Sequence, residues 1–332
     1  MSATRKKRRS TYPSTRTTES RENVKKKALA ALAAAAAVLL TSCGARTAFS
    51  EWKDESGSAF TVDGRDVMKS EVAYYFSNER SLDKKSSDAE LFGEKVLPDI
   101  IFPRAAEKVA DEHGVSLTDK EQKGIDKSAE ELDGTAKDDA QKALWRHILE
   151  GTQLCTKLLE YYQSEETSPA KASDENIRAA IKSEDFVHFK SIIIMNDDGD
   201  DVNENIATAE RVRARAAAGE DFDALAAEYS EDPAYEDNGC DYYVFRHEMI
   251  APVEDAAFSL ADGELSDVIE VNDSYSGYNI ILRLPTDDDW TEKNFDNLRN
   301  NYKSYVFYRD IYEKAAELSV SDTSDIDFSE FK

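Results

Sequence analysis

The chain has 332 residues and a formal net charge of −26. The first 42 residues hold ten Lys or Arg and two Asp or Glu, which leaves 32 basic and 66 acidic residues in the remainder, a net charge of −34. Such an acidic chain argues against binding to nucleic acid or to anionic lipid surfaces, because both need a basic face. The remainder is longer than the usual domain of ~100–200 residues, so two domains are expected.

The N-terminus has the pattern of an export signal. Two short basic clusters, at residues 5–9 and 25–27, precede an apolar run at residues 28–40. As a helix rising about 1.5 Å per residue, this run covers roughly 20 Å, less than the roughly 30 Å hydrocarbon core of a membrane. It therefore predicts a cleavable signal peptide over residues 1–42 rather than a permanent span. A short anchor helix, or an ordinary secretory signal followed by a chance cysteine, are the alternatives.

The apolar run ends in Leu-Thr-Ser-Cys-Gly at residues 40–44, which resembles a bacterial lipobox. In such boxes the cysteine receives a diacylglyceryl group and becomes the first residue of the mature chain. The resemblance implies a lipoprotein held by Cys43 on the extracytoplasmic face of the bacterial cell membrane. Residues 43–58 are polar and are expected to form a tether between the lipid and the fold.

Residues 59–173 are expected to form a helical domain. Alternating residues around Asp63-Gly64 predict a short hairpin at its start. Between residues 88 and 164 the apolar side chains then recur at helical spacing. They are Leu91, Val96, Ala105 and Val109 in one stretch and Leu144, Ile148, Leu154, Leu158 and Tyr161 in a longer one. Ser168-Pro169 marks a linker over residues 165–173.

The pattern changes to α+β over residues 174–285. A β-branched run at 186–195 predicts a central strand. Helices are expected at about 205–218, 222–229 and 253–260, and strands at 268–271 and 278–284. This order of elements predicts an α+β domain.

The C-terminal part, residues 286–318, is expected to contain one helix of about 25 residues from Trp290 to Leu318. Its aromatic side chains surround too much of the helix for a single buried stripe, so they either pack on the N-terminal helices or line a groove for unfolded chains. They are Tyr302, Tyr305, Phe307, Tyr308 and Tyr312. Residues 319–332 are predicted to be a loose polar tail.

Several short blocks follow the strand at 186–195 in a fixed order. They are Ala-Leu-Ala-Ala-Glu-Tyr-Ser-Glu-Asp-Pro at 224–233, Asn-Gly at 238–239, Met249, Pro-Val-Glu-Asp-Ala-Ala-Phe-Ser-Leu at 252–260, Gly-Glu-Leu-Ser at 263–266 and Ser-Gly-Tyr-Asn-Ile-Ile at 276–281. Together they resemble a parvulin-type peptidyl-prolyl isomerase domain. With the lipobox, the helical region before the domain and the long helix after it, the whole chain resembles PrsA-type extracytoplasmic foldases.

The resemblance implies a four-stranded antiparallel sheet with flanking helices, next to a helical chaperone-like domain that the C-terminal helix completes. The implied partners are unfolded or partly folded exported polypeptides with X–Pro segments. Rotation about the X–Pro bond faces a barrier of ~18–20 kcal/mol but breaks no bond, so neither a cofactor nor a metal is expected.

The resemblance places the proline ring of the substrate against Met249, Val253 and Phe258, with Tyr242 and Ser276 as further substrate-binding residues. Val253 is smaller than the phenylalanine of the family, which implies a wider or weaker pocket. The alternative is that these side chains are core residues of an amphipathic helix.

The polar site depends on Asp232, Ser191 and Asn279. Asp232 stands at the acidic position of the family, and its alternative role is to cap a turn before Pro233. Ser191 and Asn279 stand where the family has two histidines, and they can hydrogen-bond without carrying a charge. Isomerase activity is thus one interpretation. A holdase that keeps the fold without the chemistry is the other.

Two nearby histidines do not readily replace the missing pair. His188 precedes Ser191 by three residues, so on a regular strand it faces the opposite side. His247 lies in a loop from which it could reach the site. The favoured interpretation is that both are surface histidines.

The remaining candidate sites are weak. Cys240 reads as a lone buried thiol, and its pairing with Cys155 stays open. The acidic loop at 197–201 lacks the ligand spacing of an EF-hand, which favours a solvated loop. A solute-binding lipoprotein is the third functional interpretation. It would need two α/β lobes, and the helical first half argues against them.

Overall fold

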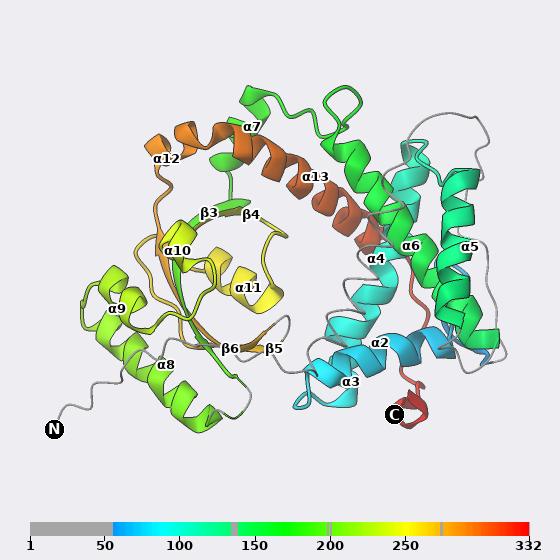
Figure 1. Cartoon of the computed structure of the whole chain (residues 1–332), viewed down its shortest axis with the longest axis horizontal. Helices are drawn as coiled ribbons and strands as arrows, with labels where there is room; N and C mark the ends of the chain where they lie inside the picture. The colour runs from blue at the N-terminus through cyan, green and yellow to red at the C-terminus, as the bar shows by residue number, and fades with distance from the viewer. Residues whose placement is uncertain (1–55, 134–138, 198, 200, 273–274, 332) are drawn as a thin grey trace.

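The computed structural model describes residues 56–133, 139–197, 199, 201–272 and 275–331. The predicted signal peptide, Cys43 and most of the predicted tether lie outside these residues. Figure 1 shows a twisted sheet with helices on both faces, and a separate group of helices beside it. The helix α13 runs from one group to the other. In the described part of the chain, every helix is too short or too polar to cross a membrane.

The helical part begins with the predicted hairpin. Strand β1 (Ser58–Val62) pairs antiparallel with β2 (Arg65–Met68). Asp63 and Gly64 between them both have positive φ, 52° and 76°, as the tight turns of two-residue hairpins require. The helices that follow are α2 (Lys69–Leu82), α3 (Asp88–Leu91), the π-helical turn η1 (Phe92–Val96), α4 (Leu97–Glu112), α5 (Asp119–Asp133) and α6 (Asp139–Gln163). The predicted hairpin and helical region are confirmed.

A buried ionic group joins three of these helices. Both guanidinium nitrogens of Arg104, on α4, donate to the carboxylate of Glu71, on α2, at 2.8 Å. His147 of α6 places its Nε2 3.3 Å from the same carboxylate. All three side chains are buried. Because each charge has a partner inside the protein, the group fixes how α2, α4 and α6 pack.

The sheet has four antiparallel strands in the order β4-β3-β6-β5. They are β3 (Phe186–Met195), β4 (Asp241–Phe245), β5 (Ile269–Asn272) and β6 (Ser276–Leu284). Eight of the ten residues of β3 are buried, because helices cover both faces of this central strand. This double burial explains why seven of the ten residues of the strand are apolar, on both of its faces. The predicted α+β fold with a four-stranded antiparallel sheet is confirmed.

Each face of the sheet has its own helices. Val187 and Phe189 of β3 pack in one cluster beneath α11 (Ala251–Ser259). Ile192 and Ile194 pack in another, beneath α8 (Val202–Ala217) and α9 (Phe222–Tyr229). The short helix α10 (Tyr235–Asn238) leads into β4. The side chains of the first cluster stand at odd-numbered positions of β3 and those of the second at even-numbered positions, because successive side chains of a strand point to opposite faces of the sheet.

The C-terminal helix is not continuous. It is divided at Asn294 into α12 (Asp288–Lys293) and α13 (Phe295–Glu317), so the prediction of a single helix from Trp290 is wrong. Asp287 caps α12, with its side chain accepting from the backbone N–H of Trp290 at 3.0 Å. The break lets α13 leave the sheet and cross to the helical part (Figure 1).

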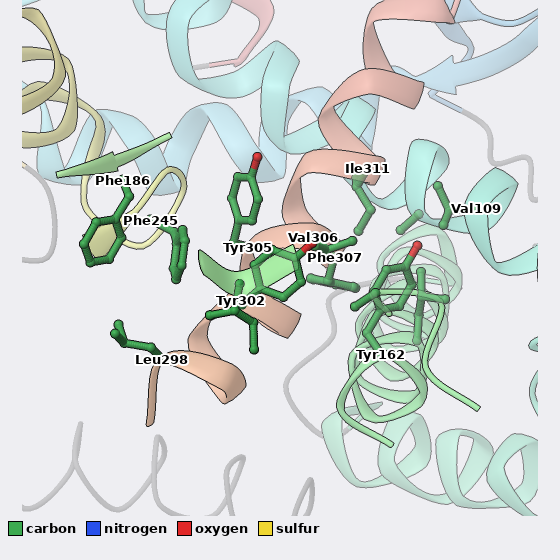
Figure 2. Packing of buried hydrophobic residues seen from close by; sticks show 14 of the residues in the cluster. Val109, Tyr162, Phe186, Phe245, Leu298, Tyr302, Tyr305, Val306, Phe307 and Ile311 are labelled. Atoms are coloured by element: carbon green, nitrogen blue, oxygen red, sulfur yellow. The ribbon is translucent and has the colours of Figure 1, made fainter. Parts of the chain in front are cut away.

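The largest apolar cluster lies along α13 and joins the two parts of the molecule. Figure 2 shows Tyr302 and Tyr305 of α13 next to Phe245 and close to Phe186 of the sheet. Farther along α13, Phe307 packs on Tyr162 of α6, with ring centroids 5.6 Å apart. The sequence left open whether the aromatic side chains of this helix are packed inside the protein or line a groove, and both occur. Tyr302 and Tyr305 are core residues, Tyr308 and Tyr312 line a cavity in the helical part, and the buried Phe307 belongs to both.

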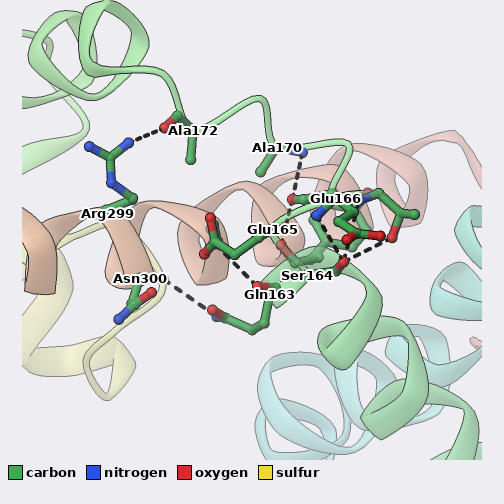
Figure 3. A network of polar contacts seen from close by, with 12 residues as sticks. Gln163, Ser164, Glu165, Glu166, Ala170, Ala172, Arg299 and Asn300 are labelled. Carbon is green, nitrogen blue, oxygen red and sulfur yellow. Dashed lines mark hydrogen bonds and ion pairs between the residues drawn. The ribbon is translucent and has the colours of Figure 1, made fainter.

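The predicted linker after α6 is tied to α13. Lys303 is almost completely buried, and its Nζ donates to the carbonyl of Gln163 at 3.1 Å and pairs with Glu165. Arg299 donates to the carbonyl of Ala172 (Figure 3). The helix α7 (Asp174–Ile181) follows, and its Ile177 packs in the same large cluster as α13. The chain between the two predicted domains is therefore held along its length.

The C-terminal tail is ordered, and the prediction of a loose polar tail is wrong. Val320 forms a β-bridge with Val62 of the hairpin. The last turn (Phe328–Phe331) buries Phe331 beside Phe76 of α2, with ring centroids 6.2 Å apart. Phe328 and Phe331, together with Ile326, supply the apolar area that holds the segment in place.

Candidate functional site

The apolar cluster beneath α11 contains four of the five predicted substrate-binding residues. We call this group, between α11 and the sheet, the α11 cluster. Its buried members are Val187, Phe189, Val244, Val253, Ala257, Val271 and Ile281, and its partly buried members include Tyr242, Met249, Phe258 and Tyr275. Pro252 stands in the first turn of α11, where a missing N–H costs no helical hydrogen bond. The helix can therefore begin directly after the loop that carries Met249.

The four predicted residues differ in exposure. Val253 is buried against the sheet, whereas Met249 and Phe258 are half-buried at the edge of the α11 cluster. The guanidinium of Arg246 lies 4.1 Å from the centroid of the Phe258 ring. A substrate could touch Met249 and Phe258 directly, whereas Val253 only supports them from below. Part of the group thus fits the alternative of core residues on an amphipathic helix.

Ser276 lies outside the α11 cluster. It is exposed at the start of β6, where its carbonyl accepts from the backbone N–H of Asn196 at 2.8 Å. Its hydroxyl accepts from the side-chain amide of Asn196 at 3.3 Å. The structure does not bring this predicted substrate-binding residue to the other four.

Ser191 and Asn279 meet inside the sheet. In the register of β3 and β6, Ser191 faces Ile281 and Asn279 faces Ile193, so the two polar side chains are diagonal neighbours on the face covered by α11. The Asn279 Nδ2 donates to the Ser191 Oγ at 3.1 Å. Both side chains are buried, so these two predicted residues form a contact that water does not reach.

A tyrosine that sequence reasoning missed extends this contact to the edge of the cluster. The hydroxyl of Tyr275, in the turn between β5 and β6, donates to the Asn279 Oδ1 at 2.6 Å. Tyr275 is half-buried and belongs to the α11 cluster. The signal in the sequence was an aromatic residue four positions before an asparagine on a buried strand. Its meaning depended on the register of the hairpin.

Asp232 has two partners. One carboxylate oxygen, Oδ1, accepts from the backbone N–H of Ala234 at 2.8 Å, which is the turn-capping role weighed above. The other, Oδ2, accepts from the hydroxyl of Tyr242. Burial and the neighbouring Asp232 carboxylate raise the pKa of Tyr242, so its hydroxyl stays protonated and able to donate. Asp232 therefore caps the turn and orients a tyrosine of the α11 cluster at once.

His188 is not a surface histidine. As expected, its side chain lies on the face opposite to Ser191, but it is buried in a stack of rings. Its ring is 3.9 Å from that of Tyr243, which in turn lies 3.7 Å from Trp290. Its Nε2 lies 2.9 Å from Asp241. The prediction of a surface histidine failed because α12 covers this part of the sheet with Trp290.

His247 is also partly covered. Its backbone has a positive φ of 70°, and its ring lies 4.4 Å from that of Tyr312 on α13. Its Nδ1 is 3.6 Å from Glu254 of α11. Burial lowers the pKa of His247, which keeps the imidazole neutral at pH 7. The interpretation of His247 as a simple surface residue is wrong, because it joins the loop before Met249 to α13.

The thiols offer no chemistry at this site. Cys240 and Cys155 are both free, so they do not pair with each other. Cys240 is fully buried, as expected of a lone core thiol, and burial raises its pKa to about 12. Among the residues that the structure describes, no group of three or more His, Cys, Asp or Glu side chains could hold a metal. Asp198 and Asp200 of the acidic loop lie outside those residues.

A cavity of about 580 Å³ lies in the helical part, away from the sheet. It is open to solvent between α4, α6 and α13, and its wall is mostly apolar and aromatic. The side chains that line it include Tyr75, Phe102, Ile148, Leu159, Tyr308 and Tyr312. Tyr312, which also contacts His247, connects this wall to the loop before Met249.

Comparison with known proteins places residues 186–284 in the family described as "Rotamase: PPIC-type PPIASE domain". The chain is 30% identical to the foldase protein PrsA of Caldanaerobacter subterraneus subsp. tengcongensis over 218 residues, covering 64% of this chain and 62% of that protein. It is 32% identical to the peptidyl-prolyl cis-trans isomerase ESS1 of Saccharomyces cerevisiae over 155 residues, 47% of this chain and 77% of that protein.

Among solved structures, the chain is similar to PrsA from Bacillus subtilis, with 20% sequence identity and a TM-score of 0.28. The match covers 80% of this chain and 92% of that one. The matched family segment coincides with the four-stranded sheet and its helices, from the first residue of β3 to the last residue of β6. The chain therefore belongs to the parvulin-type peptidyl-prolyl cis-trans isomerase family.

Proposed function

We propose that this chain is an extracytoplasmic foldase that accelerates the cis–trans isomerisation of X–Pro bonds in exported polypeptides. The relatives named as PrsA foldases support this assignment, although the chain spans only 62% of the first of them. In the proposal, residues 59–173 and 286–318 form the chaperone-like part, and residues 174–285 form the isomerase part. The observation that carries the isomerase assignment is the half-exposed pair Met249 and Phe258 above buried neutral hydrogen-bonding groups.

The chemistry asks little of the protein. Rotation about the X–Pro bond breaks the amide resonance, and the nitrogen gains a lone pair that can accept a hydrogen bond. An apolar surface that holds the proline ring, and a nearby neutral donor, stabilise this twisted state more than the planar one. Met249 and Phe258 supply the surface, and Tyr242 lies at its edge, where its single O–H would turn from Asp232 to the prolyl nitrogen. Asp232 holds that hydroxyl before the substrate binds, and Ser191 and Asn279 form the buried polar contact beneath the surface.

The test measures the cis-to-trans rate of short X–Pro peptides in the presence of the chain. Met249→Ala should lower kcat/KM about tenfold, because a Met side chain contributes roughly 1.5–3 kcal/mol of apolar contact when fully buried, and 1.4 kcal/mol is tenfold in rate. Ile206→Ala, on α8 across the sheet, is the matched control, since it truncates a half-exposed apolar side chain far from the α11 cluster. Equal losses in both variants would contradict the assignment.

The second candidate function is a holdase without isomerase chemistry. The aromatic cavity between α4, α6 and α13 favours it, because such a wall can bind apolar side chains of unfolded polypeptides. The same experiment separates the two by adding an aggregating client protein. No acceleration of peptides, together with suppressed aggregation that falls in Tyr312→Ala but not in Val320→Ala, would establish the holdase. Both positions carry exposed apolar side chains, and only Tyr312 lines the cavity.

Membrane attachment is part of the proposal. Cys43, at the end of the apolar run, would carry the lipid and place residues 44–332 outside the cell membrane. In a bacterial host, Cys43→Ser should shift the chain from the membrane pellet to the soluble extracytoplasmic fraction. A serine variant that stays membrane-bound after cleavage of the signal would rule out the lipid at Cys43.

A further inference from the structure

We propose that the helical part completes the isomerase site: Lys95 holds the end of strand β5, and this places the Tyr275 side chain that orients Asn279. The inference rests on the proposed isomerase function. It adds to that function a positioning residue, Tyr275, and a lysine from outside the isomerase segment on which Tyr275 depends.

Tyr275 is linked to Asn279 by a hydrogen bond from its hydroxyl. The Asn279 amide is buried between two hydroxyls, since it contacts Ser191 at 3.1 Å and Tyr275 at 2.6 Å. Ser191 and Asn279 are both buried, so water does not replace the serine as a partner of the amide. Removing the phenol oxygen of Tyr275 would leave one end of a buried amide without a hydrogen bond, which is costly and frees the amide to rotate. Tyr275 therefore sets the orientation of the groups beneath Met249 and Phe258.

Tyr275 lies in the turn between β5 and β6, one residue before Ser276, which pairs with Asn272 at the end of β5. The strand β5 has four residues and is an edge strand, bonded to β6 on one side only. The end of a short edge strand is among the first parts of a sheet to open. The placement of Tyr275 thus depends on what else holds Asn272.

A lysine of the helical part holds Asn272. The Nζ of Lys95, in η1 of the helical part, donates to the carbonyl of Asn272 at 3.1 Å. The side chain of Lys95 is 27% exposed, and Glu79 of α2 lies 3.9 Å from the same Nζ. Glu79 thus contacts the ammonium group of Lys95 from the helical part, while the same group donates a hydrogen bond to the last residue of β5. Figure 1 shows α3, which η1 directly follows, beside β5.

A second lysine of the helical part also contacts β5 but contributes less to holding it. Lys85, in the loop between α2 and α3, pairs with Glu270 of β5. Their side chains are 66% and 40% exposed, and exposed ion pairs of this kind contribute little to stability. Lys95 is therefore the residue through which the helical part acts, and Lys85 is an internal comparison.

The test uses the full-length chain and the peptide isomerisation assay, with kcat and KM measured separately. Tyr275→Phe should lower kcat about tenfold and leave KM within about twofold, because the lost hydrogen bond affects the orientation of Asn279 and not the apolar surface. Tyr229→Phe is the matched control. It removes a phenol that contacts Arg215 at 2.9 Å on the other side of the sheet, and it should change neither constant.

The lysines are tested by the same assay. Lys95→Met should lower kcat about three- to tenfold, Lys85→Met less than twofold, and Lys84→Met, which removes the same charge from an exposed neighbour of Lys85, not at all. In the Tyr275→Phe background, Lys95→Met should cost less than about twofold more, because both changes act through one contact. Thermal unfolding of each variant within about 2 °C of the parent shows that the fold is intact.

Three outcomes would overturn the inference. They are full kcat in a folded Tyr275→Phe variant, effects of Tyr275→Phe and Lys95→Met that multiply, and equal losses in Lys95→Met and Lys84→Met. If the unaltered chain accelerates no X–Pro peptide, the proposed function itself fails, and the inference fails with it. The unaltered chain thus separates the two kinds of failure.

Discussion

Arg104→Leu is expected to lower the free energy of unfolding by about 3–5 kcal/mol, because it leaves the Glu71 carboxylate buried with its main partner removed. Glu71 is 0% exposed and Arg104 5%. Arg104 makes two hydrogen bonds of 2.8 Å to Glu71 and one to the carbonyl of Ile100. Urea unfolding followed by circular dichroism measures the change.

Two further variants separate the charge effect from lost packing. Lys108→Leu, on the same helix α4, breaks the exposed pair with Asp63 and should cost less than about 1 kcal/mol. The double change Glu71→Leu with Arg104→Leu should recover much of the loss, because it removes both buried charges together. A loss in the double variant as large as in Arg104→Leu alone would mean that packing and not the unpaired charge dominates.

The same group gives the helical part a defined sensitivity to acid. Burial by itself raises the pKa of Glu71, but hydrogen bonds from His147 and Arg104 outweigh it and lower the pKa to about 2 from 4.5. A carboxyl with a depressed pKa in the folded state adds stability above pH 4.5, and this stability is lost as the pH falls from 4.5 towards 2. Glu71→Gln should therefore remove part of the acid dependence of unfolding in this window.

Gly277→Ala is the second change with a large expected effect, because the added methyl group has no space. A Cβ at this position would lie 2.4 Å from the carbonyl oxygen of Ile194 and 3.1 Å from the Cα of Met195. Both atoms belong to the backbone of β3, which pairs with β6 at this point. The two central strands would have to separate, at a cost of at least about 1–3 kcal/mol.

The separation should also reach the candidate site, because Asn279 stands two residues farther along β6. We expect isomerase kcat/KM to fall at least about tenfold in Gly277→Ala, together with a lower unfolding temperature. Gly124→Ala is the control. It lies within α5 with open space around its Cα, and alanine there should raise stability by up to about 1 kcal/mol. Unchanged stability and activity in Gly277→Ala would show that the strands tolerate the shift.

Local sequence was enough for the elements that carry the family resemblance. The β-branched run at 186–195 became the central strand because its apolar residues stand at both odd and even positions, which suits burial on both faces. Pro252 located the first turn of α11, and Asp63-Gly64 located the hairpin turn. In each case a few neighbouring residues determine the element, so the element can be predicted without knowledge of the rest of the chain.

The polar site was only partly accessible in this way. Asp232, Ser191 and Asn279 could be named from their place among the sequence blocks, but Tyr275 could not. Its contact with Asn279 arises where β6 pairs with β5, next to the pair Asn272–Ser276. Register is set by pairs of strands and not by either strand alone, so it cannot be predicted from the sequence of one strand.

The sequence by itself determined the class of each half, the antiparallel sheet implied by its resemblance, and four residues of the α11 cluster. The tertiary structure alone decided the break at Asn294, the stack of His188, Tyr243 and Trp290, the docking of Phe331 on Phe76 and the contact of Lys95 with Asn272. Each of these joins residues that are distant in the chain or changes the environment of an element from outside. Their free energy comes from surfaces that do not exist until the two halves have packed together.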